Sequence, residues 1–286
     1  FTTDGSFTST VVRDWRLPRV LGALVFGSAL AVSGAIFQSL TRNPLGSPDV
    51  IGFATGAYTG ALIALTVVGT GVVTASLGAL AGGLLTALLV YLLAYSRGMQ
   101  GFRLIIVGIA VTALLHALNL FLLLRAQEEV AMAASIWGAG SLALLSWDKL
   151  LPAVIGLLLC TPGLLLVPHL RQLELGDDAA AAHGVSVERS RIGLVLFAVA
   201  LVAIVTAATG PIAFVALAAP QVARRLAGSA GIPLVSSAFV GAVLLLGADL
   251  IAQHTLPVDV PVGIVTVVLG GIYLLTLLIQ EARRRS

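Results

Sequence analysis

The chain has 286 residues, of which 58% are hydrophobic and only 10% are charged, and its mean hydropathy is +1.06. Ordinary soluble domains are about 25% charged, so the composition excludes that class. The formal net charge of +3 comes almost wholly from arginine, which in a membrane protein reports topology and not nucleic-acid binding. The single cysteine, Cys160, excludes an internal disulfide. The sequence predicts an all-α, polytopic membrane protein forming one transmembrane domain over residues 1–286.

Nine apolar segments are candidates for membrane spans, since a helix needs about 20 apolar residues to cross a hydrocarbon core about 30 Å thick. The seventh is the weakest candidate because it is short and contains Pro220. The nine segments are 17–41, 50–68, 72–95, 104–124, 150–168, 192–209, 210–226, 233–253 and 261–280.

The placement of arginines predicts the orientation of these spans. If the C-terminal Arg283, Arg284 and Arg285 are cytoplasmic, alternation across nine spans puts most basic residues inside, as the positive-inside rule requires. The same alternation places Phe1 outside. One further span before Phe1 would then bring the intact subunit to ten spans.

The longest polar segment, residues 169–191, lies between two uncharged apolar runs, and we expect it in the cytoplasm. Asp177 and Asp178 favour a helix start and Gly184 favours its end, because acids suit the positive helix N-terminus and glycine tolerates the left-handed stop. A second helix would begin after Ser186. The small residues 179–182 would let another protein approach closely, although a solvated connector without a partner fits the pattern equally well.

Arg16 and Arg19 stand at the outer end of the first span in the sequence RLPR. At this spacing they lie on one side of a helical turn, so their two guanidinium groups are expected to face the extracytoplasmic water together. Such a pair can bind carboxylates of a partner in bidentate fashion. The alternative is that both are snorkelling membrane anchors.

Two further sets of residues are candidates for a substrate pathway. Gly52, Gly56 and Gly60 recur at every fourth position, which in lipid normally means close helix packing and alternatively a glycine-lined path. His116 and Asn119 are polar groups within a span, which makes them functional candidates, although a neutral hydrogen bond inside the bundle is the commoner role.

The remaining polar residues limit which ligands this chain can bind. The outer segment 125–148 is expected to contain a helix lying along the membrane surface. Asp249 lies within a span and Asp259 follows it. The sequence contains neither a metal-ligand motif nor a nucleotide-binding Gly-rich loop, so we expect this chain to bind no metal, cofactor or ATP.

Several motifs, in the same order along essentially the whole chain, resemble the FecCD-type permease subunits of iron-siderophore, haem and vitamin B12 ABC importers. The segments DVIGFATGAYTG and GGIYLLTLLIQEARRR look closest to the iron-enterobactin branch. The motifs are RLPR at 16–19, SGAIFQSLTRNPLGSPDVIG at 33–52, LGDDAAAAHGV at 175–185, GPIAFVALAAPQVARRLAG at 210–228, and then GADLIAQ and VPVGIVT.

The resemblance implies a type II, ten-span permease, here without its first span, in the cytoplasmic (inner) membrane. It would pair with a second permease subunit, identical or homologous, around a central pathway. Two ATPase subunits carrying ATP and Mg would dock beneath, and an extracytoplasmic binding protein would deliver a ferric siderophore, haem or cobalamin. The chain itself would not be an enzyme. A secondary transporter driven by an ion gradient is the alternative class, and it predicts ionisable groups at the bilayer midplane.

The resemblance also assigns site residues. Arg16 and Arg19 match arginines that meet acidic residues of the binding protein, and Asp259 is a further candidate for that outer surface. Gln253 stands where many members carry another outward-facing arginine. The segment 175–185 matches the loop that couples the permease to the ATPase, with His183 where leucine is common. Its candidate contact residues are Leu175, Gly176, Asp177, Asp178, Ala179, Ala180, His183 and Gly184.

Overall fold

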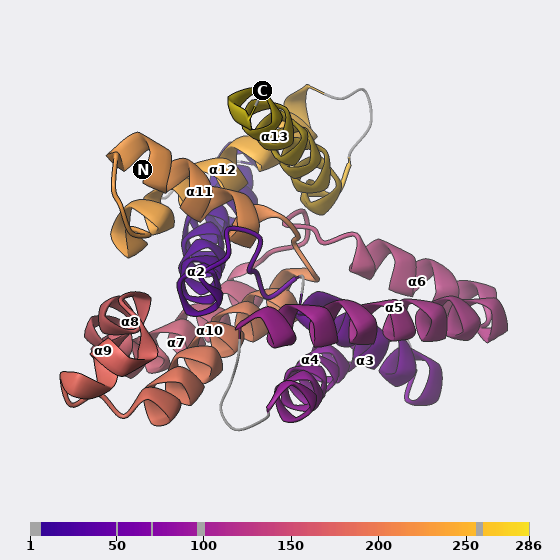
Figure 1. Ribbon diagram of the computed structural model, residues 1–286. Helices are drawn as coiled ribbons and strands as arrows, with labels where there is room; N and C mark the ends of the chain where they lie inside the picture. The colour runs from indigo at the N-terminus through magenta and orange to yellow at the C-terminus, as the bar shows by residue number, and fades with distance from the viewer. Residues whose placement is uncertain (1–6, 50, 70, 96–100, 256–259, 286) are drawn as a thin grey trace.

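A computed structural model describes residues 7–49, 51–69, 71–95, 101–255 and 260–285, and over these ranges the chain is helical without any strand (Figure 1). The all-α prediction is confirmed. The helices are α1 (Phe7–Thr10), η1 (Val11–Arg16), α2 (Leu17–Thr41), α3 (Phe53–Val67), α4 (Val72–Ala94), α5 (Gly101–Arg125), α6 (Glu128–Gly138), α7 (Trp147–Leu159), η2 (Thr161–Leu166), α8 (Val167–Glu174), α9 (Asp177–Ala182), α10 (Val187–Thr209), α11 (Val215–Ala227), α12 (Leu234–His254) and α13 (Val262–Arg285).

Six helical segments of the described chain are long and apolar enough to cross a membrane, so the chain is a multi-pass membrane protein. Two shorter apolar helices, Phe53–Val67 and Val262–Thr276, accompany them. Each of the nine candidate spans contains helix, but the seventh forms only the 13-residue α11. A total of ten spans stays a prediction. The six long segments are Val11–Thr41, Val73–Ala94, Phe102–Arg125, Trp147–Glu174, Val187–Thr209 and Leu234–His254.

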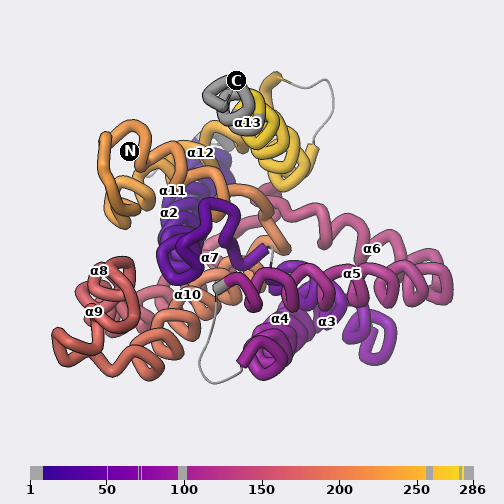
Figure 2. Tube along the Cα trace, in the orientation of Figure 1, coloured from indigo at the N-terminus to yellow at the C-terminus, as the bar shows by residue number. Residues whose placement is uncertain are grey.

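Helix α2 is the centre of the bundle. It packs against α10, α11 and α12, and Figure 2 shows it between α11 and α12 on one side and α10 on the other. Small residues permit this: a Cβ on Gly34 would lie 1.7 Å from the Ala216 carbonyl oxygen. Buried polar groups on α2 form hydrogen bonds with neighbouring helices. For example, the Gln38 amide donates to the Leu217 carbonyl on α11 at 2.9 Å.

The predicted glycine stripe packs two helices together. A Cβ on Gly60 would lie 2.1 Å from the Gly78 carbonyl oxygen, and one on Gly56 would lie 2.0 Å from the Thr86 hydroxyl, both on α4. Of the two interpretations of the stripe, close helix packing therefore applies to Gly56 and Gly60. Gly52 does not belong to this stripe, because it precedes α3 with a φ of +88° and faces Thr112 on α5.

Two regions differ from the predicted uninterrupted spans. The fifth candidate, 150–168, is divided into α7, η2 and α8, and Pro162 and Gly163 lie in the 3-10 turn η2 between the two α-helices. The seventh begins with an extended stretch from Gly210 to Phe214, both with positive φ (75° and 69°), and α11 starts only at Val215. These two interruptions explain why η2, α8 and α11 are short.

Candidate functional site

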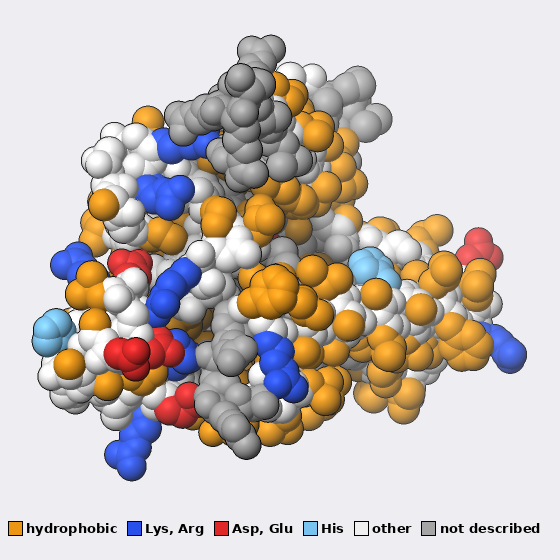
Figure 3. Space-filling view, in the orientation of Figure 1, with side chains coloured by type: hydrophobic (Ala, Val, Ile, Leu, Met, Phe, Trp, Pro, Cys, Tyr) orange, Lys and Arg blue, Asp and Glu red, His pale blue; other side chains and the backbone are white. Residues whose placement is uncertain are grey.

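The polar segment 169–191 folds as predicted from its own residues. Helix α9 begins at Asp177 and ends at Ala182, and Gly184 takes a positive φ of 81°. A chain reversal then leads into α10, whose first residue is Val187. Charged side chains gather at the end of the molecule where α8 and α9 lie (Figure 3).

The Asp177 carboxylate connects this short helix to the bundle through two arginines. Its Oδ1 accepts hydrogen bonds from Arg42 at 3.0 Å and from Arg191 at 2.9 Å. Arg42 also donates to the Leu173 carbonyl at 2.8 Å. Because Arg42 follows α2 and Arg191 lies in α10, one carboxylate connects the α9 turn to two long helices.

The surface of α9 is small and accessible. Asp178, Ala181, Ala182 and His183 are exposed, and the neighbouring Leu175 side chain is 70% exposed. An exposed leucine beside a helix of small residues is typical of a protein contact.

Ala180 differs from the sequence-based expectation, because it is 0% exposed and faces the interior. Helical periodicity turns this position inward while its neighbours point outward. Gly176, with a φ of 122°, allows the bend between α8 and α9, and a Cβ there would meet nothing within 4 Å.

The other end of α2 carries a second set of charges. Arg19 donates to both carboxylate oxygens of Asp249 on α12, with distances of 2.8 to 3.1 Å. The Asp249 side chain is 1% exposed and that of Arg19 is 18% exposed. The Gln253 amide donates to the same carboxylate at 2.7 Å.

This arrangement corrects the expectation that Arg16 and Arg19 face the water together. Arg16, at the end of η1, is exposed, whereas Arg19 is turned into the bundle by a carboxylate distant in the sequence. Gln253, noted above as a departure from the family pattern, belongs to the same cluster. Asp259 lies outside the described residues.

A third polar contact lies where two irregular segments meet. The backbone N–H of Phe214 donates to Oδ2 of Asp49 at 3.2 Å. The Pro44 carbonyl accepts from Gln221, on α11. Phe214 and Gln221 are seven residues apart, which is about 10 Å at 1.5 Å per residue, so the loop 42–52 runs alongside the first turns of α11. The sequence analysis did not predict this contact.

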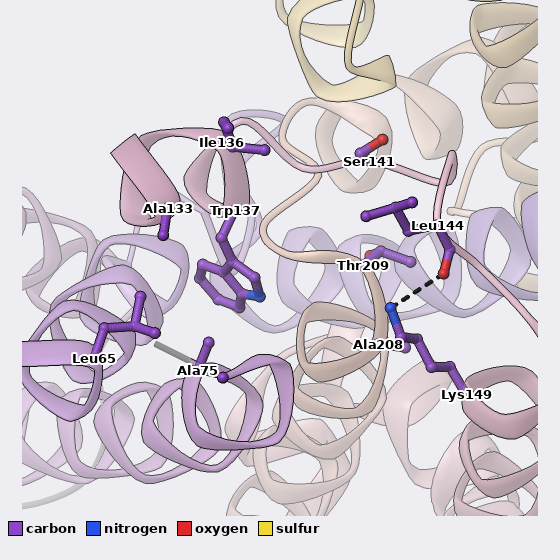
Figure 4. Close-up of a pocket in the computed structure, with 11 residues that line it drawn as sticks. Leu65, Ala75, Ala133, Ile136, Trp137, Ser141, Leu144, Lys149, Ala208 and Thr209 are labelled. Atoms are coloured by element: carbon purple, nitrogen blue, oxygen red, sulfur yellow. Dashed lines mark hydrogen bonds between the residues drawn. The ribbon is translucent and has the colours of Figure 1, made fainter. Parts of the chain in front are cut away.

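The bundle holds two cavities of interest near α3 and α6. One, of about 290 Å³, has a mostly apolar wall that includes Leu65 and Trp137, and Lys149 at its edge donates to the Leu144 carbonyl (Figure 4). The other, of about 390 Å³, is lined by His116 and Asn119. Among the described residues, no group of three or more His, Cys, Asp or Glu side chains could hold a metal ion.

Comparisons with known proteins agree with one another. Residues 1–280 match the FecCD transport family. The chain is 56% identical to the ferric enterobactin transport system permease protein FepG of Escherichia coli strain K12, over 96% of this chain and 84% of that protein. It is 37% identical to the Fe(3+)-citrate import system permease protein YfmE of Bacillus subtilis strain 168, with the same 96% and 84% coverage. A solved inward-facing metal-chelate type ABC transporter has a TM-score of 0.85 and 29% identity, covering 98% of this chain and 91% of that one.

The described chain is an all-helical bundle with membrane-length helices, and ion pairs hold a short exposed helix at one end of it. The bundle has the fold of an ABC importer subunit. These features define a multi-pass membrane permease. The chain belongs to the FecCD transport family. The predicted resemblance to siderophore permeases, and among them to the iron-enterobactin branch, is confirmed by the 56% identity to FepG.

Proposed function

We propose that the chain is the permease subunit of an ATP-driven importer that moves a ferric siderophore across the cytoplasmic membrane. Relatives named for ferric enterobactin and Fe(3+)-citrate transport support this class of substrate. The chain acts in transport and performs no covalent chemistry of its own. ATP and Mg bind to separate ATPase subunits, and a second permease subunit completes the pathway.

The observation that carries this proposal is the position of α9. A six-residue helix presents small side chains to solvent, while Asp177 connects its first turn to Arg42 and Arg191. A force applied to α9 by a docked ATPase is therefore transmitted directly to α2 and α10. Leu175, Asp178, Ala181, Ala182 and His183 form the contact surface in this mechanism. Arg16, at the opposite end of the bundle, faces the extracytoplasmic binding protein.

An ion-gradient mechanism is less well supported. Asp249, the ionisable group identified within a span, is neutralised by Arg19 at 2.8 Å and is not free to bind a transported cation. Burial raises the pKa of the Asp49 carboxyl to about 6, and the backbone hydrogen bond that it accepts from Phe214 at the start of α11 partly offsets this rise. Both carboxylates thus have structural partners.

Reconstitution tests the proposal. The chain is assembled in proteoliposomes with a second permease, the ATPase and a binding protein, and uptake of ferric enterobactin is measured with ATP on the ATPase side. We expect uptake to require ATP hydrolysis and to survive ionophores that collapse proton and sodium gradients. Uptake that follows an imposed ion gradient without ATP would instead establish a secondary transporter.

A further inference from the structure

A cavity of about 390 Å³, whose wall is largely apolar with several polar side chains, lies between α3, α5, α6 and the extended segment before α11. Its volume falls in the range of about 300 to 1,000 Å³ typical of small-molecule sites. Small residues and Pro211 form the rest of its wall. Five side chains supply its polar groups: Thr55, Tyr58, His116, Asn119 and Ser135.

Asn119 is the unusual member of this wall. Its side chain is buried, with the residue only 3% exposed, and neither its amide nitrogen nor its oxygen has a hydrogen-bond partner among the described residues. Buried amides are nearly always hydrogen-bonded, because leaving both groups unpaired is costly. Because the residue also lines the cavity, a molecule that enters the cavity is a candidate partner for this amide.

The chemistry of the wall restricts that molecule. Hydroxyl, amide and imidazole groups supply both donors and acceptors, and no Asp, Glu, Lys or Arg side chain of the described residues lines the cavity. A bare divalent cation prefers carboxylate oxygens, and a phosphate prefers arginine or lysine. The wall therefore suits an uncharged, oxygen-rich group.

Resting on the proposed function, we propose that this cavity binds the oxygen-rich periphery of the ferric chelate during passage through the permease. The Asn119 Nδ2 group donates to a ligand oxygen and its Oδ1 accepts from a ligand N–H or O–H, and His116, one turn earlier on the same face of α5, supplies a neighbouring contact. A cavity of this size in one subunit accommodates part of a chelate, and the second permease would contact the rest.

The test compares two substitutions on α5. Asn119→Leu keeps the branched shape of the side chain and removes both hydrogen-bonding groups. Thr112→Val is the matched control, because the Thr112 hydroxyl is also buried without a partner but Thr112 does not line the cavity. In the reconstituted importer we measure ferric enterobactin uptake per ATP hydrolysed. We expect Asn119→Leu to lower this ratio at least three- to tenfold, the effect of losing one hydrogen bond, because both the donor and the acceptor are removed, while Thr112→Val leaves it unchanged.

A second measurement does not depend on the folding of Asn119→Leu. Asn119→Cys is made in a Cys160→Ala background, and its alkylation by a small maleimide is timed in the assembled importer with and without ferric enterobactin. Slower alkylation with the chelate supports the site. An unchanged alkylation rate, or a transport ratio in Asn119→Leu equal to that of the parent, overturns the inference while the proposed function stands. If the parent protein transports no ferric enterobactin under ATP, the proposed function is what fails.

Discussion

Arg19 and Asp249 form a bidentate ion pair across 230 positions of sequence, with the guanidinium Nε and Nη2 atoms 2.8 to 3.1 Å from the carboxylate oxygens. The pair joins α2 to α12 close to the end of each helix. It changes the interpretation of the arginine pair in RLPR, because one arginine holds the bundle together and only Arg16 is exposed for a partner.

The first prediction follows from that ion pair. Removing one member of a buried pair leaves an uncompensated charge and costs about 3 to 5 kcal/mol. We expect Asp249→Ala to lower the midpoint of thermal unfolding in detergent strongly, whereas Arg16→Ala leaves it unchanged. Combining Asp249→Arg with Arg19→Asp should recover part of the stability. Equal midpoints for the parent and Asp249→Ala would show that the pair contributes nothing.

The second prediction concerns Arg16 as a docking residue. An exposed arginine that meets a carboxylate of a partner steers association and contributes to affinity. We expect Arg16→Glu to leave insertion and assembly with the ATPase intact and to reduce stimulation of ATP hydrolysis by the loaded binding protein. Truncation of a desolvated charge costs about 2 to 5 kcal/mol, so a large loss at physiological salt indicates docking. Full stimulation in the variant would leave Arg16 as a membrane anchor.

The third prediction separates two adjacent acids in the α9 turn. Asp177 bonds to Arg42 and Arg191, whereas Asp178 is exposed and forms no ion pair among the described residues. Asp177→Asn removes the charge of this carboxylate, and we expect stimulated ATP hydrolysis to continue while uptake per ATP falls. Asp178→Asn is the matched control and should keep the parent ratio. Identical ratios in the two variants would remove Asp177 from the coupling mechanism.

The fourth prediction tests the close approach of α3 and α4. A Cβ on Gly60 would lie 2.1 Å from the Gly78 carbonyl oxygen, so Gly60→Ala must push the helices apart. Overpacking of this kind costs about 1 to 3 kcal/mol, and we expect a lower unfolding midpoint. Gly271→Ala provides the control, because a Cβ at Gly271 in α13 meets nothing within 4 Å. Its midpoint should stay the same or rise, since alanine favours helix by about 1 kcal/mol over glycine. A stable Gly60→Ala protein would contradict the packing described here.

Local properties of the sequence determined much of this protein. Hydropathy located the helices and established the all-α membrane class, because burial in lipid depends on the composition of each segment. Asp177, Asp178 and Gly184 correctly marked the limits of α9, since helix starts and stops depend on neighbouring residues. The spacing of Gly56 and Gly60 correctly predicted close packing.

Only the tertiary structure decided which distant groups meet. Arg19 turns inward because α12 places Asp249 beside it, and the Phe214 N–H reaches Asp49 because the loop 42–52 runs alongside the first turns of α11. Asn119 lines a cavity next to α3 and α6, and its amide has no hydrogen-bond partner in the described part of the chain. Hydropathy orders segments along one dimension and carries no information on the lateral arrangement of helices. The partners of polar groups within the bundle depend on that arrangement.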